Sequence, residues 1–288
     1  MAQSYREHIL TGRTVGGRYR LNEPTRAPLG AAGSVLGRSS GASLEFLDHR
    51  DYQPGDDLRL IDWSAYARSD RLVLKLYRQE FTPHLDILLD ASASMALAGS
   101  SKAGGTMHMA AALATAAANG GYSYCCHVVG TDQPFAPNVD VVSWPDMAFS
   151  GACDVAMWLV HGRANLRPRS LRVFISDLLY AQEPLSILQP MAAGAAGLFV
   201  VQMLAQADVQ PEAGGNAHLV DSETGDVRAV YLDAPAIKKY SRVLAAHQQD
   251  WRRSCRQVGA AMTTLTAEDV CSADDLTPLA EMGLLKPA

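Results

Sequence analysis

From residue 84 onward, short apolar runs alternate with segments whose apolar residues recur at helical spacing. Strands are predicted at residues 84–90, 122–129, 171–176, 197–204 and 262–265. Helices are predicted at 103–119, 154–163, 184–193, 235–258 and 274–282, and a β-hairpin at 217–220 and 227–231. Continuous apolar strands separated by helices are typical of a parallel sheet covered on both faces. We therefore predict an α/β fold with a mostly parallel sheet flanked by helices.

The N-terminal part lacks this alternation. Residues 1–43 are rich in Gly, Arg, Ser and Pro, and we expect a loosely ordered lead-in, with residues 30–41 as a loop. Residues 44–83 contain a turn at Pro54 and Gly55 and a predicted strand near residues 72–77. We expect this extension to dock on the core domain, which spans residues 84–288.

Composition narrows the class of protein. The 288 residues are 48% apolar and 19% charged, which is ordinary for a globular protein, and the net charge of −5 argues against general nucleic-acid binding. The five cysteines lack metal-ligand spacing and suit a reducing compartment. No apolar stretch follows the charged N-terminus, and the longest apolar run, residues 191–201, is too short to span a bilayer. We expect a soluble, cytoplasmic protein without membrane insertion.

Three oxygen-bearing side chains follow the first predicted core strand. Asp90, Ser92 and Ser94 are spaced two residues apart, and alternate residues of extended backbone point the same way. One carboxylate and two hydroxyls suit Mg²⁺ or Mn²⁺ with water left on the ion. The loop therefore predicts a hard-cation site, and the alternative is that these side chains cap the following helix.

A second predicted strand ends at Ser176 and Asp177. Ligands of parallel sheets bind where loops leave the carboxyl ends of the strands. If the two strands are neighbours, Asp177 faces the same spot as Asp90 and binds the ion directly or through water.

The loop at residues 90–94, with a later strand ending in Ser176 and Asp177, resembles the metal-ion-dependent adhesion site of von Willebrand factor A domains. Residues 46–63 resemble the signature of a bacterial family, domain-of-unknown-function family fifty-eight. Residues 67–68, 73–75, Lys102 and residues 221–225 extend that similarity. The resemblance implies a von Willebrand factor A-like, Rossmann-type fold. It also implies a MoxR-type AAA+ ATPase as partner, acting with this chain in chaperone-like assembly or maturation of a client protein.

One position departs from the adhesion site that the chain resembles. An intermediate loop usually supplies a Thr there, and Cys153 stands at the corresponding position. A thiol is a poor ligand for Mg²⁺. Either the site keeps four ligands and water fills the gap, or cation binding is weakened. We expect binding that is retained but weakened.

The segment before the core is dense in charge. Opposite charges around its tight turn predict an ion-pair network that docks the segment, with Trp63 and Tyr66 as packing anchors, rather than a catalytic centre. The residues of this structural signature are Arg50, Tyr52, Pro54, Gly55, Asp56, Asp57, Arg59, Asp62, Trp63 and Arg68.

Together these features favour a non-catalytic, metal-dependent adaptor whose open coordination position accepts an acidic side chain of a partner. Two alternatives stay open. Asp90 after a strand suits an aspartyl nucleophile of a metal-dependent phosphotransfer enzyme, although such enzymes commonly have a second Asp where this chain has Ser92. The chain also suits a structural subunit with a degenerate metal site.

Overall fold

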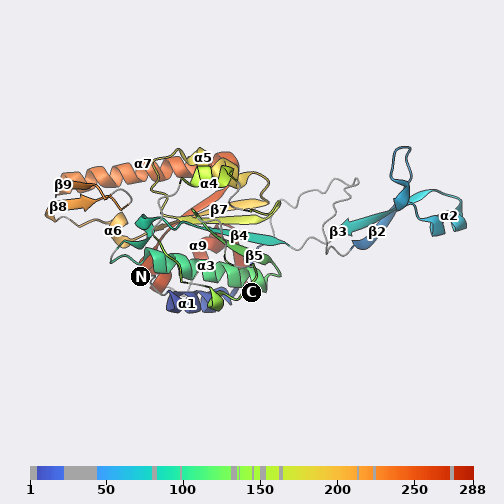
Figure 1. Cartoon of the computed structure of the whole chain (residues 1–288), viewed down its shortest axis with the longest axis horizontal. Coiled ribbons are helices and arrows are strands. Elements are labelled where there is room, and N and C mark those ends of the chain that lie inside the picture. Colours follow the sequence, from blue (N-terminus) through green and yellow to red (C-terminus); the bar gives the residue numbers. More distant parts are fainter. Residues whose placement is uncertain are drawn as a thin grey trace. The chain divides into compact units, whose positions relative to one another are not determined.

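The computed structural model divides the chain into two compact units, one of residues 1–29 with 83–288 and one of residues 30–82, which are described separately (Figure 1). The described residues are 5–22, 44–79, 83–97, 99–130, 135, 137–144, 146–149, 154–161, 165–212, 214–222, 225–272 and 276–288.

A five-stranded parallel sheet forms the centre of the larger unit, in the order β10-β7-β6-β4-β5. This confirms the predicted α/β fold with a mostly parallel sheet flanked by helices and is consistent with a Rossmann-like arrangement. The predicted strands match the observed ones within about two residues. The strands are β4 (His84–Leu89), β5 (Ser123–Val128), β6 (Leu171–Ser176), β7 (Gly197–Leu204) and β10 (Ala261–Thr266).

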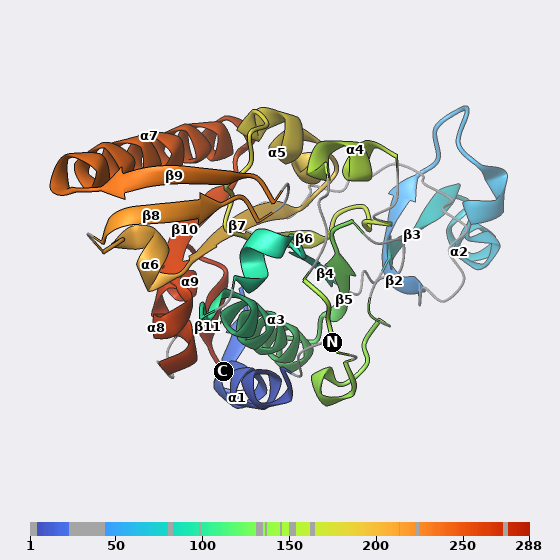
Figure 2. The same ribbon diagram turned by 60° about the vertical axis from the view of Figure 1, so that its left-hand side comes forward.

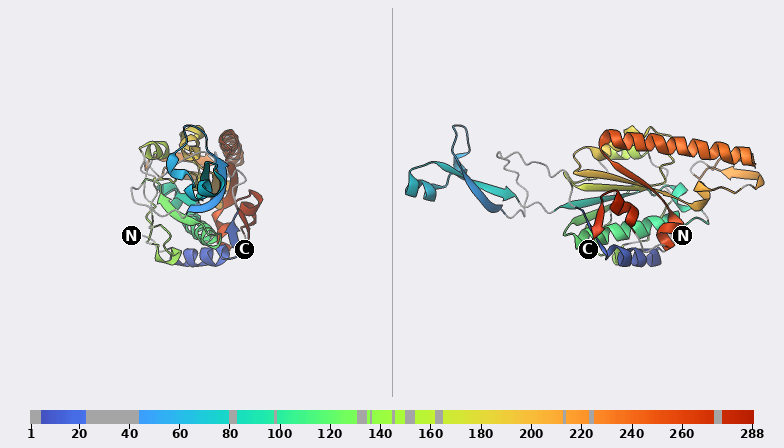
Figure 3. Two further views of the ribbon diagram at one scale, coloured as in Figure 1. Left: turned by 90° about the vertical axis from the view of Figure 1, so that its right-hand side faces the viewer. Right: turned by 180° about the vertical axis from the view of Figure 1, so that it is seen from behind.

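Helices cover both faces of this sheet, and each face has its own apolar core (Figure 3). Ile87 and Ile175 point toward the face with α3 (Lys102–Asn119), whereas Leu88 and Phe174 point toward the opposite face. That opposite face is covered by α4 (Val155–Val160), α5 (Pro184–Ala192) and α7 (Ala234–Val258). Burial on both faces explains why the strands are continuous apolar runs rather than alternating ones.

The N-terminal lead-in differs from the expected loose segment, because residues Arg6–Gly16 form helix α1 against α3. The backbones approach so closely that a Cβ at Gly12 would lie 2.1 Å from the His108 carbonyl oxygen. At Gly16 a Cβ would lie 2.3 Å from that of Ala112. Two glycines one turn apart therefore allow α1 to pack on the Ala-rich α3. Residues 30–41, the predicted loop, lie outside the described residues.

The remaining described elements of the larger unit are two antiparallel strand pairs and several short helices (Figure 2). Strand β1 (Tyr19–Leu21) pairs antiparallel with the C-terminal β11 (Leu285–Pro287), which joins the two ends of the described chain. Strands β8 (Gly215–Val220) and β9 (Val227–Leu232) form a separate antiparallel pair. The short helices are η2 (Ala93–Ala96), η3 (Val141–Ser143), α6 (Gln206–Val209), α8 (Ala267–Ser272) and α9 (Thr277–Glu281).

The smaller unit is built on an antiparallel pair of strands, β2 (Leu44–Asp51) and β3 (Val73–Gln79), with a register shift between Phe46 and Asp48. Helices η1 (Leu58–Leu60) and α2 (Trp63–Ser69) lie between the two strands in the chain. The prediction that this segment docks on the core stays a prediction.

Among the described residues, no helix combines the length and the apolar character needed to cross a bilayer.

Candidate functional site

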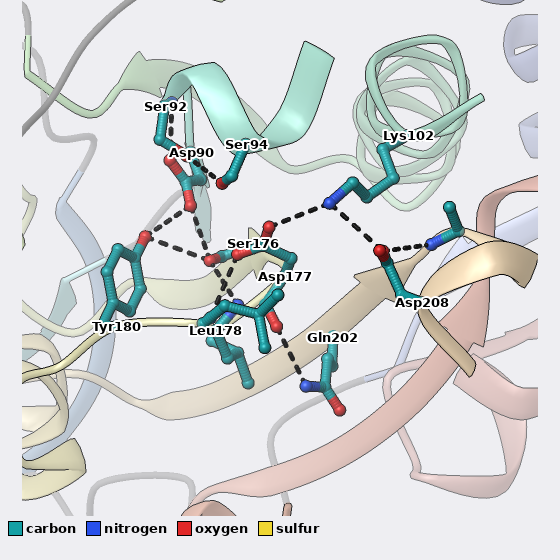
Figure 4. A network of polar contacts seen from close by, with 12 residues as sticks. Asp90, Ser92, Ser94, Lys102, Ser176, Asp177, Leu178, Tyr180, Gln202 and Asp208 are labelled. Carbon is teal, nitrogen blue, oxygen red and sulfur yellow. Dashed lines mark hydrogen bonds and ion pairs between the residues drawn. The ribbon is translucent and has the colours of Figure 1, made fainter. Parts of the chain in front are cut away.

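The candidate site lies where the order in which strands are added to the parallel sheet changes direction. After β4 the chain adds β5 on one side and then returns to place β6 on the other side of β4. Parallel sheets bind ligands outside the carboxyl ends of strands at such a point. Asp90 follows β4 and Asp177 follows β6, and the Asp90 N–H donates to the Ile175 carbonyl at 3.0 Å. Both carboxylates therefore lie at one edge of the sheet (Figure 4).

Asp90 is buried and is held by hydroxyl and amide donors (Figure 4). Its Oδ2 accepts hydrogen bonds from Ser176 Oγ at 2.7 Å and from Tyr180 Oη at 2.5 Å. Its Oδ1 accepts one from the Ser92 N–H at 2.8 Å. These donors fix the carboxylate while leaving acceptor capacity on Oδ1.

The charge on Asp90 is only partly compensated. Burial raises the pKa of Asp90, as does the nearby charge of Asp177, while the hydrogen bonds from Tyr180, Ser176 and Ser92 oppose the rise. Within the described residues no basic side chain forms an ion pair with Asp90. A buried carboxylate of this kind is stabilised in its ionised form by a bound cation.

Ser92 and Ser94 complete the predicted donor set. Their Oγ atoms form a hydrogen bond of 2.9 Å beside Asp90. Neighbouring ligands around an octahedral Mg²⁺ lie roughly 2.9 Å apart, because each Mg–O bond is about 2.0–2.1 Å long. Neither hydroxyl caps a backbone N–H of η2, which weakens the helix-cap alternative for Ser92. The carboxylate and the two hydroxyls thus fit a small hard cation.

Asp177 is engaged differently from the sequence-based expectation. Its Oδ2 lies 3.1 Å from Lys102 Nζ, and its Oδ1 accepts the Leu179 N–H at 3.1 Å. Lys102 Nζ also lies 3.2 Å from Asp208 Oδ2, which itself accepts the Ala205 N–H at 2.9 Å. Asp177 therefore faces the same edge as Asp90, but with an ammonium group already against it.

Four residues of this site escaped the sequence-based site prediction: Ser176, Tyr180, Lys102 and Asp208. Tyr180 lies between β6 and α5, so no strand or helix pattern marks it in the sequence. It follows Leu178, whose backbone has a positive φ of 60°. Asp208 lies on a four-residue helix after the neighbouring strand β7. The available signal was positional, because three of the four follow or end a strand at the same sheet edge.

Cys153, the doubtful fifth ligand, lies outside the described residues, so its predicted role is not tested. In the described part of the chain, no group of three or more His, Cys, Asp and Glu side chains could hold a metal ion. A cation at Asp90 would therefore depend on serine hydroxyls and water in addition to the carboxylate.

The charged signature of the smaller unit forms local ion pairs and caps. Arg50 binds Asp56 through two hydrogen bonds of 2.9 and 2.6 Å. Asp62 caps α2 by accepting the N–H groups of Ser64 and Ala65, and it also contacts His49 at 2.9 Å. The remaining signature residues lie in the same turns and helices: Tyr52, Pro54, Gly55, Asp57, Arg59, Trp63 and Arg68.

The role of Trp63 and Tyr66 as packing anchors of the docked segment stays a prediction. Their rings meet edge to face at 6.2 Å, yet Trp63 is 61% exposed and Tyr66 37% exposed. They lie on one side of a short helix whose described residues are not buried, so they pack mainly against each other.

A second polar cluster lies further back along β4. The buried Asp86 accepts from Nε2 of His127 at 3.0 Å and from Nε2 of His84 at 3.2 Å, and its Oδ2 accepts the Arg167 N–H at 3.1 Å. Each of these polar groups has a partner, so the cluster is an internal network and not a second open site.

Residues 48–139 match the family described as protein of unknown function DUF58. The DUF58 match includes the signature turn, the Asp90 loop, Lys102 and α3. The other polar residues of the site, Ser176, Asp177, Tyr180 and Asp208, lie beyond it.

Sequence similarity to some relatives covers more of the chain than the DUF58 match does. Uncharacterized protein Rv1480 of Mycobacterium tuberculosis is 26% identical over 252 residues, covering 82% of this chain and 78% of the relative. Uncharacterized protein Mb1516 of Mycobacterium bovis gives the same values. Uncharacterized protein MAV169 of Mycobacterium avium is 33% identical over 104 residues, covering 35% of this chain and 60% of the relative.

Two solved structures also show similarity. Conserved hypothetical protein BatB from Bacteroides thetaiotaomicron has a TM-score of 0.32 at 9% identity. An aerotolerance-related membrane protein from Bacteroides fragilis has a TM-score of 0.38 at 13% identity. Each comparison covers 69% of this chain and 98% of the solved chain.

Proposed function

We propose that this chain is a non-catalytic protein-binding module that uses a divalent cation, Mg²⁺ or Mn²⁺, at Asp90, Ser92 and Ser94. The observation that carries the proposal is the buried Asp90 carboxylate, without an ion-pair partner among the described residues, beside two serine hydroxyls 2.9 Å apart. A cation held by so few protein ligands keeps open positions for water or for a carboxylate from a partner.

The partner proposed is a MoxR-type AAA+ ATPase together with its client protein. Support for this comes from the resemblance of residues 90–94 and 176–177 to the adhesion site of von Willebrand factor A domains, and from the DUF58 match. We propose a von Willebrand factor A-like fold on the same grounds. The role follows as assembly or maturation of a client complex.

The chemistry around Asp90 favours binding over phosphotransfer. Its neighbours Ser176 and Tyr180 are hydroxyl donors that already bind Oδ2, and the residue two positions later is Ser92 rather than a second carboxylic acid. Burial raises the pKa of Tyr180 well above its usual value, so that Tyr180 remains a protonated donor rather than a base. A nucleophilic Asp90 would lack a neighbouring acid–base group at these positions.

The proposal is tested by calorimetric titration of the protein with MnCl₂ and MgCl₂. We expect binding at millimolar concentrations, and at least a roughly tenfold loss of affinity in Asp90→Asn. The exposed Asp250→Asn is the matched control and should bind as the wild type does.

The protein-binding role is tested with a purified MoxR-type ATPase. Retention of the ATPase on immobilised wild-type protein should require Mg²⁺, be abolished by chelator and be absent with Asp90→Asn. Isolation of a phosphoryl group on Asp90 after incubation with a phosphodonor would contradict the non-catalytic assignment.

A further inference from the structure

We propose that the ammonium group of Lys102 acts as a built-in cation that occupies Asp177 and Asp208 and thereby confines any divalent ion to Asp90, Ser92 and Ser94. Lys102 would then set the affinity of the site rather than bind a partner. This inference rests on the proposed function, because it concerns the same sheet edge.

The position of Lys102 is unusual for a lysine. It is the first residue of α3, and its side chain is 0% exposed. Lysine is almost never fully buried unless it is paired with an opposite charge. Here the ammonium lies 3.1 Å from Asp177 and 3.2 Å from Asp208, so it is shared between a carboxylate that follows β6 and one on α6 (Figure 4).

These contacts occupy Asp177. Oδ2 contacts Lys102, Oδ1 accepts the Leu179 N–H, and the main-chain carbonyl accepts from Gln202 Nε2 at 2.9 Å. A metal ion that bound Asp177 directly would compete with an ammonium group already at hydrogen-bond distance. Because like charges repel, the ammonium also disfavours a divalent ion close to Asp177.

The charges at this edge do not cancel. Asp90, Asp177 and Asp208 contribute three carboxyl groups, whereas Lys102 contributes a single positive charge. Asp177 and Asp90 follow neighbouring strands and lie at the same edge of the sheet (Figure 4). Lys102 compensates one of the two charges of Asp177 and Asp208, and among the described residues Asp90 is the one of the three carboxyl groups without an ammonium contact. Asp90 also has the serine hydroxyls beside it.

Removal of the ammonium should therefore convert Asp177 into a metal ligand. Lys102→Met keeps the length and apolar stem of the side chain but leaves two buried carboxylates without their counter-charge. Breaking a buried ion pair is destabilising for this reason, and a divalent cation can supply the missing charge.

The experiment compares calorimetric titration of the wild type and Lys102→Met with MnCl₂. We expect the affinity for Mn²⁺ to rise at least about tenfold in Lys102→Met, because the ion gains a carboxylate ligand. The melting temperature of this variant should rise more steeply with MnCl₂ than that of the wild type. Lys102→Arg keeps a positive charge and is the conservative control, for which no gain is expected.

A second pair of variants identifies the responsible carboxylate and protects against loss of folding. Lys102→Met with Asp208→Asn removes one charge of each sign and should retain the gain, because Asp177 remains free to bind. Lys102→Met with Asp177→Asn should lose it.

The outcomes separate the two proposals. If the wild type binds Mn²⁺ and neither Lys102→Met nor its Asp208→Asn combination binds it more tightly, Lys102 is not a competing cation, while the proposed cation site stands. If none of the proteins binds Mn²⁺, both proposals fail. If only the Lys102 variants bind it, the built-in cation is supported and the metal-dependent function of the natural protein is rejected.

Discussion

At the scale of single residues, the pKa values of two buried aspartates, Asp86 in β4 and Asp90 directly after it, are shifted in opposite directions. Burial raises the pKa of Asp86, but the hydrogen bonds from His127 and His84 outweigh it, and the pKa falls well below its ordinary value. The pKa of Asp90 rises instead, because burial and the charge of Asp177 outweigh its hydroxyl and amide donors. Asp86 has a basic partner in His127 and belongs to an internal ion pair. Asp90 has no basic partner among the described residues, so its carboxylate can accept a ligand.

The pair formed by Asp86 and His127 predicts a pH dependence of stability. Burial lowers the pKa of His127, but hydrogen bonds to Asp86 and Cys125 more than offset this and raise it from 6.5 to about 9. A raised pKa in the folded state means that the stabilisation is fully present below pH 6.5 and is lost as the pH rises through about 9.

The corresponding variant is His127→Gln. We expect its free energy of unfolding at pH 6 to fall by about 3 kcal/mol, because Asp86 loses a buried counter-charge. Urea denaturation at pH 6 and pH 9.5 measures the effect, and the two proteins should differ less at the higher pH. His218→Gln, an exposed histidine on β8, is the control. An equal loss at both pH values would indicate a packing defect instead.

At the scale of elements, strands were easier to predict than the first helix. Leu85 and Ile87 of β4 are fully buried, and the apolar run that contains them was sufficient to predict the strand. Helix α1 has exposed polar residues and two glycines in its C-terminal half, with a third directly after it, and this composition predicted a loosely ordered segment. Its stability comes from contact with α3, and that contact depends on residues more than ninety positions away in the sequence.

This packing gives a second stability prediction. Ala at Gly12 would place Cβ 2.1 Å from the His108 carbonyl oxygen, so α1 would have to move away from α3. The higher helix propensity of Ala should not compensate, and we expect a loss of roughly 1–3 kcal/mol in the free energy of unfolding.

Gly17→Ala is the matched control for Gly12→Ala. Gly17 has a right-handed helical backbone, and its added Cβ would lie 3.3 Å from the nearest oxygen, that of Thr14. Chemical denaturation should show little change for this variant. Equal stability of Gly12→Ala and the wild type would mean that α1 does not pack on α3 this closely.

At the scale of the whole molecule, each unit has its own polar network. Asp62 in the smaller unit binds Ser64, Ala65, His49 and Lys75, all of which belong to that unit. Asp90 binds partners within the larger unit. Changes to one network should therefore affect its own unit first.

Asp62→Ala tests this separation. The variant loses the cap of α2 and two basic contacts, so we expect faster amide hydrogen exchange in residues 63–69 while Mn²⁺ binding at Asp90 is unchanged.

The hydrogen bond from His49 is the largest cause that lowers the pKa of Asp62, from 3.8 to about 2. Protection of α2 in the wild type should therefore be present above pH 3.8 and lost as the pH falls through about 2. Loss of Mn²⁺ binding in Asp62→Ala would contradict the separation.

The amino-acid sequence by itself determined the parallel sheet and the local spacing of Asp90, Ser92 and Ser94. Both are encoded within a few neighbouring residues, the first by apolar runs and the second by alternate positions. The tertiary structure alone decided that Lys102 would meet Asp177 and Asp208, which lie 75 and 106 positions further along the chain. Apolar patterns report which segments are buried, whereas the pairing of buried charges depends on which strands become neighbours and on which loops then share an edge.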